Sequence, residues 1–243
     1  MLTNIRIVLV RPFHPGNIGS TARAMKTMGL THLYLISPLD FPSDEATKMA
    51  ASADDVLINA TVNNNLYDAL KDCTVVIAST ARPRGYDLPE LNPEQCAQML
   101  LAGAQKDHKV ALVFGPERMG LSNDDLQLSK YRVSIPTHPD YSSLNLAAAV
   151  QTLSYEIYKQ SIIVDDNLLN QRISRELPNI ENIERFYYHL EETLKGSGFI
   201  IKNHPGDVMK KMRTLFDRAE MDVNELNILR GALSSVQNRP EKD

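Results

Sequence analysis

Cysteine is scarce in this chain, and long hydrophobic runs are missing from it. The 243 residues include two cysteines, Cys73 and Cys96, without a CxxC pair, which argues against a disulfide scaffold and a cysteine-rich zinc site. No apolar run approaches the roughly 20 residues that cross a bilayer. Arg6 interrupts the apolar stretch at the N-terminus, and no small-residue cleavage site follows it, so we expect no secretory signal. These observations predict a cytoplasmic location.

Basic charge is not in excess either. The chain carries 26 lysines and arginines against 30 aspartates and glutamates, which gives a net charge of −4. This is not the charge of a protein that coats nucleic acid, although a local basic site remains compatible with it. The first 39 residues contain no acid and four cations, which are Arg6, Arg11, Arg23 and Lys26.

Short apolar runs alternate with helical patterns up to about residue 160. Hydrophobic residues make up 43% of the chain and charged residues 23%, as in ordinary globular proteins. The runs predict strands that are buried on both faces: Ile5–Val10, Leu33–Ile36, Val56–Ile58, Thr74–Ala78, Val110–Phe114 and Tyr131–Ile135. Such alternation predicts an α/β domain with a parallel sheet.

Capping signals mark the helices between these runs. We expect a first helix at Asn17–Met28, ended by Gly29, and a longer one at Leu144–Gln160. Helix starts are indicated at Ser43, at Asn92 before Pro93, and at Ser122 three residues before Asp125.

The character of the sequence changes after residue 160. Residues 161–178 show weak periodicity and are interpreted as a linker between a domain at 1–160 and a helical domain at 179–243. Three amphipathic helices are expected at about 180–195, 206–219 and 223–237. Asn179 can cap the first, and Asp222 with Glu225 resembles a capping box on the third.

Three polar loops each follow a predicted strand and precede a helix, which places them at the carboxyl edge of the sheet, where open α/β folds bind ligands. The first runs from Arg11 to Arg23, and its free helix amides favour an anion. For Asn17 alone, helix capping is the better interpretation, and for Arg23 a solvated side chain is at least as good as a functional one. Neither the GxGxxG nor the GxxxxGK[ST] phosphate-binding motif occurs.

The other two loops are as ambiguous when the residues are considered singly. Gly115 and Gly120 in the second loop let the backbone approach a neighbour closely, and Glu117 reads best as a helix N-terminal charge. The third loop offers Ser142, Ser143 and Asn145, although one residue suffices to cap a helix. No Ser/His/Asp arrangement can be assembled, so the residues alone name no reaction.

Taken together, three stretches resemble, in order, the motifs of the SpoU (TrmH-like) branch of the SPOUT RNA 2′-O-ribose methyltransferases. They are PGNIGSTARAMKTMG, ALVFGPERMGLS and SSLNLAAAVQTLSYEIY. The resemblance covers Ile5 to Tyr158. Within the family, the chain is most similar to the enzymes that methylate the ribose of nucleotide 32, cytidine or uridine, in the tRNA anticodon loop.

The resemblance implies a SPOUT fold, a parallel sheet with a deep trefoil knot, followed here by the small helical domain. It also implies S-adenosyl-L-methionine as cofactor and a homodimer with shared active sites. The apolar positions Leu146, Ala149, Val150 and Leu153 of the long helix are candidates for that dimer contact. By resemblance, cofactor contacts fall on Ser79, Thr80, Ala81, Gly115, Ile135, Ser142, Ser143 and Leu144.

The family's catalytic polar residues correspond to Asn17, Arg23, Glu117, Ser143 and Asn145. A ribose 2′-hydroxyl is a poor nucleophile until its proton is removed or strongly hydrogen-bonded. Since a guanidinium stays protonated, Arg23 is expected to hold the adjacent phosphate and polarise the hydroxyl, not to act as a base. No metal is implied.

A tRNA substrate requires phosphate contacts despite the negative net charge. The expected footprint consists of Arg6, Arg11, Arg23, Lys26, Arg82, Arg84 and Arg118, with Lys202, Lys210, Lys211 and Arg213 from the helical domain. For the last four, a solvated helix face is an equal alternative. Two other functions stay open, which are 2′-O-methylation of ribosomal RNA and catalytically silent RNA binding.

Overall fold

The computed structural model describes residues 1–81, 88–105, 108–163, 176–200 and 206–237. The chain divides into two compact units, Met1–Arg172 and Ile173–Asp243. The first unit contains the sheet, and the second consists of helices. Three residues of the expected RNA footprint lie outside the described residues: Arg82, Arg84 and Lys202.

A seven-stranded parallel sheet forms the centre of the first unit, with the strand order β3-β2-β1-β6-β4-β7-β5. The strands are β1 (Ile5–Val10), β2 (His32–Ile36), β3 (Thr61–Asn63), β4 (Cys73–Ser79), β5 (Glu90–Leu91), β6 (Lys109–Phe114) and β7 (Tyr131–Val133). Every residue of β1 is buried, as its continuous apolar run predicts for a central strand. The α/β expectation is therefore confirmed, while the trefoil knot stays a prediction.

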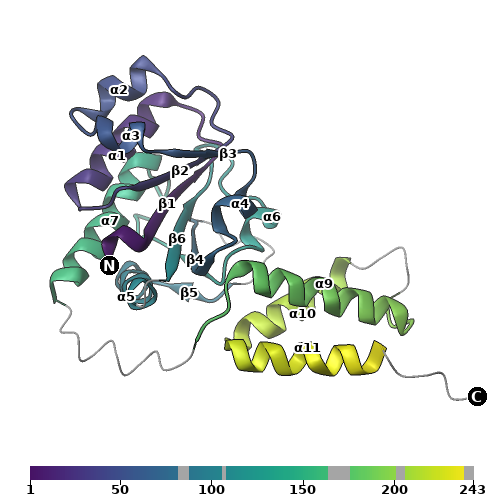
Figure 1. The fold of residues 1–243 in the computed structure, drawn as a ribbon. Helices are drawn as coiled ribbons and strands as arrows, with labels where there is room; N and C mark the ends of the chain where they lie inside the picture. The colour runs from purple at the N-terminus through teal and green to yellow at the C-terminus, as the bar shows by residue number, and fades with distance from the viewer. Residues whose placement is uncertain (82–87, 106–107, 164–175, 201–205, 238–243) are drawn as a thin grey trace, which may run out of the picture. The chain divides into compact units, whose positions relative to one another are not determined.

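Helices cover both faces of this sheet. They are α1 (Pro15–Thr27), α2 (Asp44–Ala50), α3 (Asp54–Ile58), α4 (Leu66–Leu70), α5 (Pro93–Ala104), α6 (Asn123–Leu126) and α7 (Leu146–Ile163), after a short 3-10 turn at Leu2–Asn4. Figure 1 shows α1, α5 and α7 on one side of the sheet and α4 and α6 on the other. Helix α7 packs against both α1 and α5, which buries Leu146, Val150 and Leu153 within the subunit.

Five of the six predicted strands are confirmed: β1 has the expected bounds, and the ends of the other four shift by one or two residues. The prediction of a strand at Val56–Ile58 is wrong, because this segment is the second half of α3. Asp54 and Asp55 precede it in the first helical turn, where carboxylates stabilise a helix. The short edge strands β3 and β5 were not predicted, since neither contains a buried residue.

Two of the predicted helix caps are confirmed in full, whereas Ser43 directly precedes α2 but makes no side-chain cap bond. Asn92 and Ser122 each form a reciprocal capping box, with Gln95 and Asp125 respectively. Gly29 follows α1 with a φ of +70°, a left-handed conformation that suits glycine. Helix α7 begins two residues later than expected and continues to Ile163, into the segment interpreted as linker.

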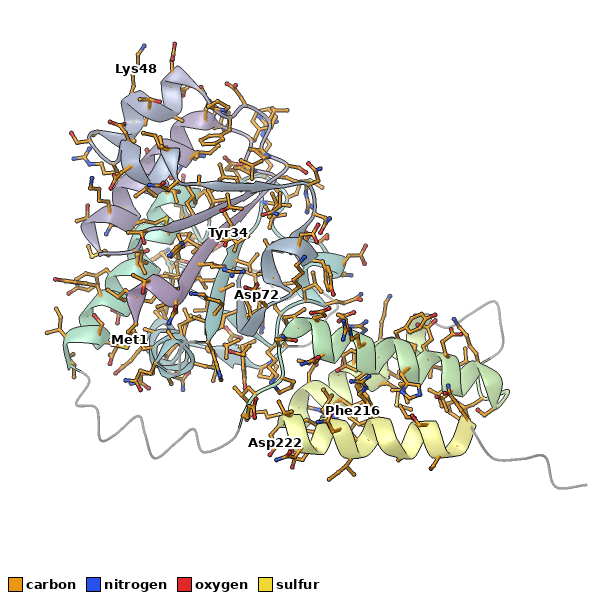
Figure 2. The ribbon with its side chains drawn as sticks, viewed as in Figure 1. Met1, Tyr34, Lys48, Asp72, Phe216 and Asp222 are labelled. Atoms are coloured by element: carbon orange, nitrogen blue, oxygen red, sulfur yellow. The ribbon has the colours of Figure 1, made fainter. Side chains whose placement is uncertain are left out.

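The second unit contains the three predicted helices, α9 (Ile180–Gly196), α10 (Gly206–Ala219) and α11 (Val223–Gln237). Asn179 caps α9, and Asp222 and Glu225 bond reciprocally at the start of α11. The core of the bundle contains Ile183, Phe186, Tyr187, Leu190, Ile200, Met209, Met221 and Leu226. Phe216, labelled in Figure 2, packs edge-on against Phe186 with ring centroids 5.0 Å apart.

Candidate functional site

The candidate site lies at the carboxyl edge of the sheet. All the strands are parallel, so the loops that follow β1, β4, β6 and β7 emerge at this same edge. The register brings them together, because Phe114 at the end of β6 pairs with both Leu9 of β1 and Ser79 of β4, and Ser79 pairs with Val133 of β7. The three motif loops are therefore spatial neighbours although about 130 residues separate the first from the last.

One chain of hydrogen bonds joins the three loops. The Asn17 side-chain amide donates to Glu117 Oε1 at 2.8 Å, and the Asn145 amide donates to Asn17 Oδ1 at 2.9 Å. Asn145 Oδ1 in turn accepts from the backbone amides of Ala147 and Ala148, at 2.9 and 3.3 Å, and so caps α7. We call Asn17, Glu117 and Asn145 the motif network. It fixes the first turn of α1 and the start of α7 to the loop after β6.

The capping interpretation of Asn17 is wrong. Helix α1 begins at Pro15, and His14 occupies the N-cap without a side-chain bond. Asn17 therefore lies inside the first turn, and its side chain is available to Glu117 and Asn145.

Glu117 supplies the negative charge at that helix start. Its carboxylate accepts from the amides of Phe13 at 2.9 Å and His14 at 3.2 Å, just before α1. The interpretation as a helix N-terminal charge thus holds, but for α1 and not for the helix that follows in sequence. Partial burial alone would raise the pKa of Glu117. The hydrogen bonds from Asn17 and from the Phe13 amide outweigh that effect and hold the pKa below its usual value.

A cavity of about 160 Å³ opens beside the motif network. Its wall contains all eight residues that the resemblance assigned to the cofactor: Ser79, Thr80, Ala81, Gly115, Ile135, Ser142, Ser143 and Leu144. Glu117 and Arg118 also line it. Hydroxyl groups from the loops after β4 and β7 and the apolar side chains of Ile135 and Leu144 therefore surround one space, next to the acid of the motif network.

Gly115 is required by the shape of this wall. A Cβ atom on Gly115 would lie 2.3 Å from the Leu121 nitrogen and 2.4 Å from the Gly120 carbonyl carbon. Gly120 itself has a φ of +65°. The loop from Gly115 to Gly120 thus folds back on itself, and only glycine at position 115 leaves room for this conformation.

The predicted cations differ in how freely they can meet a phosphate. Arg23 is exposed on α1, nearly two turns from Asn17, and makes no side-chain hydrogen bond or ion pair with the part of the chain that the structure describes. Lys26 pairs with Asp55 at 2.7 Å. Arg11 pairs with the buried Asp125 at 2.5 Å and so connects the end of β1 to the start of α6.

The inclusion of Arg6 in the expected RNA footprint is wrong. Its guanidinium is buried, donates to the Ala69 carbonyl oxygen and to Asp72, and lies 4.7 Å from the centre of the Tyr34 ring. Tyr34 and Asp72 are both labelled in Figure 2. A phosphate could reach Arg6 only if these contacts broke, so we withdraw it from the RNA footprint.

In the second unit the predicted cations divide in the same way. Lys210 and Lys211 are exposed on α10. Arg213 is instead half-buried, pairs with both oxygens of Glu184 at 2.6 and 2.8 Å, and lies over the Tyr187 ring. Its position stabilises the contact between α9 and α10.

Several residues of the site were not predicted from the sequence. Thr137, Leu146 and Ala149 line the cavity, and nothing in their local pattern indicates this. Asp125 was recognised only as a helix cap, although it also holds Arg11. A charged partner more than 100 positions away leaves no signal in one sequence.

The described residues contain neither a metal-binding cluster nor a helix that could cross a membrane. No group of three or more histidine, cysteine, aspartate or glutamate side chains there could hold a metal ion. Across the same residue ranges, no helix is both long and apolar enough to span a membrane.

Comparison with known proteins gives two family matches. Residues 4–155 match the SpoU rRNA Methylase family, and residues 181–243 match the C-terminal domain of the tRNA methyltransferase TrmJ. The tRNA (cytidine/uridine-2′-O-)-methyltransferase TrmJ of Photorhabdus laumondii is 48% identical over 242 residues, which cover 100% of both chains.

Solved structures resemble the chain as well. The crystal structure of TrmJ from Z. mobilis is 35% identical, with a TM-score of 0.81, and the match covers 96% of this chain and 99% of that one. The SpoU methyltransferase AviRb from Streptomyces viridochromogenes, solved with the cofactor AdoMet, shares the fold at 24% identity and a TM-score of 0.53, over 65% of this chain and 61% of that one.

Proposed function

The chain belongs to the SpoU rRNA Methylase family, and from that premise we propose that it transfers a methyl group from S-adenosyl-L-methionine to a ribose 2′-hydroxyl of tRNA. The observation that carries this proposal is the motif network beside the cavity, which joins the three motif loops into one site. We propose the cytoplasm as the location of this reaction.

The proposed tRNA substrate is supported by similarity over the whole length of the chain. A TrmJ relative is aligned from end to end, and the second unit matches the TrmJ C-terminal domain separately. An rRNA substrate is not favoured, because the helical unit is matched to a tRNA enzyme. We propose cytidine or uridine at nucleotide 32 of the anticodon loop as the target.

The cavity fits S-adenosylmethionine on chemical grounds. Ser79, Thr80 and Ser142 offer hydroxyl groups to its polar ends, while Ile135 and Leu144 offer apolar contact to its ring. Gly115 keeps a side chain out of the space. When bound there, the cofactor supplies an activated methyl group.

The chain's own residues orient the ribose. Arg23 is free to hold a phosphate next to the target nucleotide and to hydrogen-bond its 2′-hydroxyl. Asn17 is bonded to both Glu117 and Asn145, so the three residues keep α1, and with it Arg23, in place relative to the cavity. Ser143, exposed at the cavity wall, is available to the ribose. Orientation of the hydroxyl is then the main source of rate.

Replacement of Arg23 tests this assignment. Arg23→Ala is expected to lower kcat for tRNA methylation by at least about 100-fold, the scale of losing one positioned charge, with S-adenosylhomocysteine affinity unchanged. Lys48→Ala, which removes another exposed cation of the same unit, is the control and should keep normal turnover. Normal turnover in Arg23→Ala would remove Arg23 from the reaction.

We also propose a homodimer, on a different face from the one expected. Leu146, Val150 and Leu153 are used inside the subunit. Another stripe of α7 is exposed and apolar: Tyr155 at 51%, Tyr158 at 40%, Ile162 at 69% and Ile163 at 63%. Leu144, 41% exposed just before α7, also lines the cavity, so a second copy that covers this side would close the site. Light scattering should give twice 27.2 kDa, and 27.2 kDa at all concentrations would refute the dimer.

The helical unit is proposed as an additional tRNA contact. Lys210 and Lys211 are the exposed cations of α10 that we assign to it. Each phosphate contact that is lost reduces the slope of log affinity against log salt by roughly 0.7 to 0.9. Charge reversal of both lysines should therefore weaken tRNA binding and flatten its salt dependence, without affecting S-adenosylhomocysteine.

A further inference from the structure

An aromatic side chain is exposed at the edge of the motif network. Phe13 lies between β1 and α1 and is 44% exposed. The Arg118 guanidinium lies 5.1 Å from the centre of its ring, and the His14 ring meets it edge-on at 4.8 Å. Arg118 and His14 are themselves exposed, so the three side chains form a surface cluster.

Glu117 of the motif network also anchors the backbone of this cluster. The Phe13 amide donates to Glu117, and Arg118 directly follows Glu117 in the chain. Arg118 also lines the cavity. The Phe13 backbone is therefore bonded to the motif network and Arg118 belongs to the cavity wall, so the cluster adjoins the site that the ribose has to reach.

We propose that Phe13 and Arg118 form a stacking platform for an unpaired RNA base that flanks the target ribose. The inference rests on the proposed function, because it takes RNA as the substrate. Proteins recognise single-stranded RNA by stacking its bases on aromatic rings and on planar guanidinium groups. A cation beside an exposed ring also suits a base that carries a phosphate, and it disfavours a purely apolar partner.

The chain offers a direct probe of base stacking, since it contains no tryptophan. Phe13→Trp introduces a single indole whose fluorescence is quenched when a base stacks on it. A single-stranded anticodon-loop oligoribonucleotide should quench Phe13→Trp. The same oligonucleotide should leave Ile58→Trp unchanged, because Ile58 is 81% exposed at the end of α3 and outside the cluster.

Two results of this titration would overturn the platform. Emission from Phe13→Trp that does not respond to RNA shows that no base stacks there. Emission that changes on dilution of the protein alone shows that a second copy of the chain covers the ring. Because neither readout requires methyl transfer, a failure of the platform remains distinguishable from a failure of the proposed function.

Steady-state kinetics separate stacking from simple packing. Phe13→Leu keeps an apolar side chain of similar size but has no π-face, whereas Phe13→Tyr retains one. Since stacking of one base changes affinity by about 5- to 150-fold, the KM for tRNA should rise by that factor in Phe13→Leu and remain near normal in Phe13→Tyr. S-adenosylhomocysteine affinity should stay constant in both. Equal KM values for the two variants would contradict the proposal even if the wild type methylates tRNA normally.

Discussion

Replacement of Gly115 by alanine would place a methyl group against the backbone of its own loop. The added Cβ would lie 2.3 Å from the Leu121 nitrogen and 2.4 Å from the Gly120 carbonyl carbon. Ordinary contacts for such atoms are about 3.5 Å, so the loop must move by on the order of 1 Å. No rotamer change can relieve the overlap, because the neighbours are backbone atoms.

The displacement falls on the cavity wall, to which Gly115, Glu117 and Gly120 all belong. Overpacking of this kind destabilises the native conformation of the loop by about 1 to 3 kcal/mol. If the relaxed loop can no longer adopt the shape that binds the ligand without this cost, the affinity for S-adenosylhomocysteine falls by about 5- to 150-fold. Isothermal calorimetry measures this loss directly.

Gly231→Ala is a matched control for this substitution. Gly231 lies within α11, and no heavy atom comes within 4 Å of an added Cβ. Alanine is favoured over glycine in a helix by up to about 1 kcal/mol, so this variant should melt at a slightly higher temperature and bind the cofactor product normally. Unchanged affinity in Gly115→Ala would refute the claim that this close backbone approach shapes the cavity.

The remaining predictions concern the acids of the site. Asp125→Ala removes the partner of Arg11 and a helix cap, which should destabilise the protein by about 2 to 4 kcal/mol, whereas the exposed Asp124→Ala should have little effect in thermal unfolding. Burial opposes ionisation of Asp125, but Arg11 and Ser122 outweigh it and lower the pKa. The ionised Asp125 therefore contributes its full stabilisation above its pKa in the unfolded chain, about 3.9, and this contribution is lost as pH falls through the lower pKa of the folded protein. The stability of Asp125→Ala should lack this pH dependence. Glu117→Gln places an amide where two backbone donors and Asn17 need an acceptor. We therefore expect kcat to fall at least about tenfold while cofactor affinity changes little. A kcat equal to that of the wild type would count against the role of the motif network.

The central strands could be predicted from the sequence because burial on both faces leaves a continuous apolar run. The run Ile5–Val10 gives β1 its exact bounds. The run at Val56–Ile58 is three residues long, and a periodicity cannot be read from so few positions. The acids before it, which favour a helix, decided the outcome.

The candidate site was predictable only as a set of loops. Parallel alternation places them at one edge of the sheet, but Asn17 can be a helix cap or a network member with the same local sequence. What decides between these is Asn145, 128 residues away. Arg6 was misjudged for the same reason, because its partner Asp72 is remote in sequence.

The exposed stripe of α7 shows a similar limit. The helix is apolar on more than one side, so its composition indicates contacts on both. Only the packing of α1 and α5 shows that Leu146, Val150 and Leu153 belong to the subunit core and that the stripe around Tyr155 and Ile162 is exposed.

The most direct test of the account is to map the methylated nucleoside by mass spectrometry. Unmodified tRNA and ribosomal RNA are incubated with S-adenosylmethionine and either the wild-type protein or Arg23→Ala. The account predicts a 2′-O-methyl group on cytidine or uridine at nucleotide 32 of tRNA with the wild type, and little or none with the variant. Methylation of a base, methylation confined to ribosomal RNA, or equal products from both proteins would contradict it.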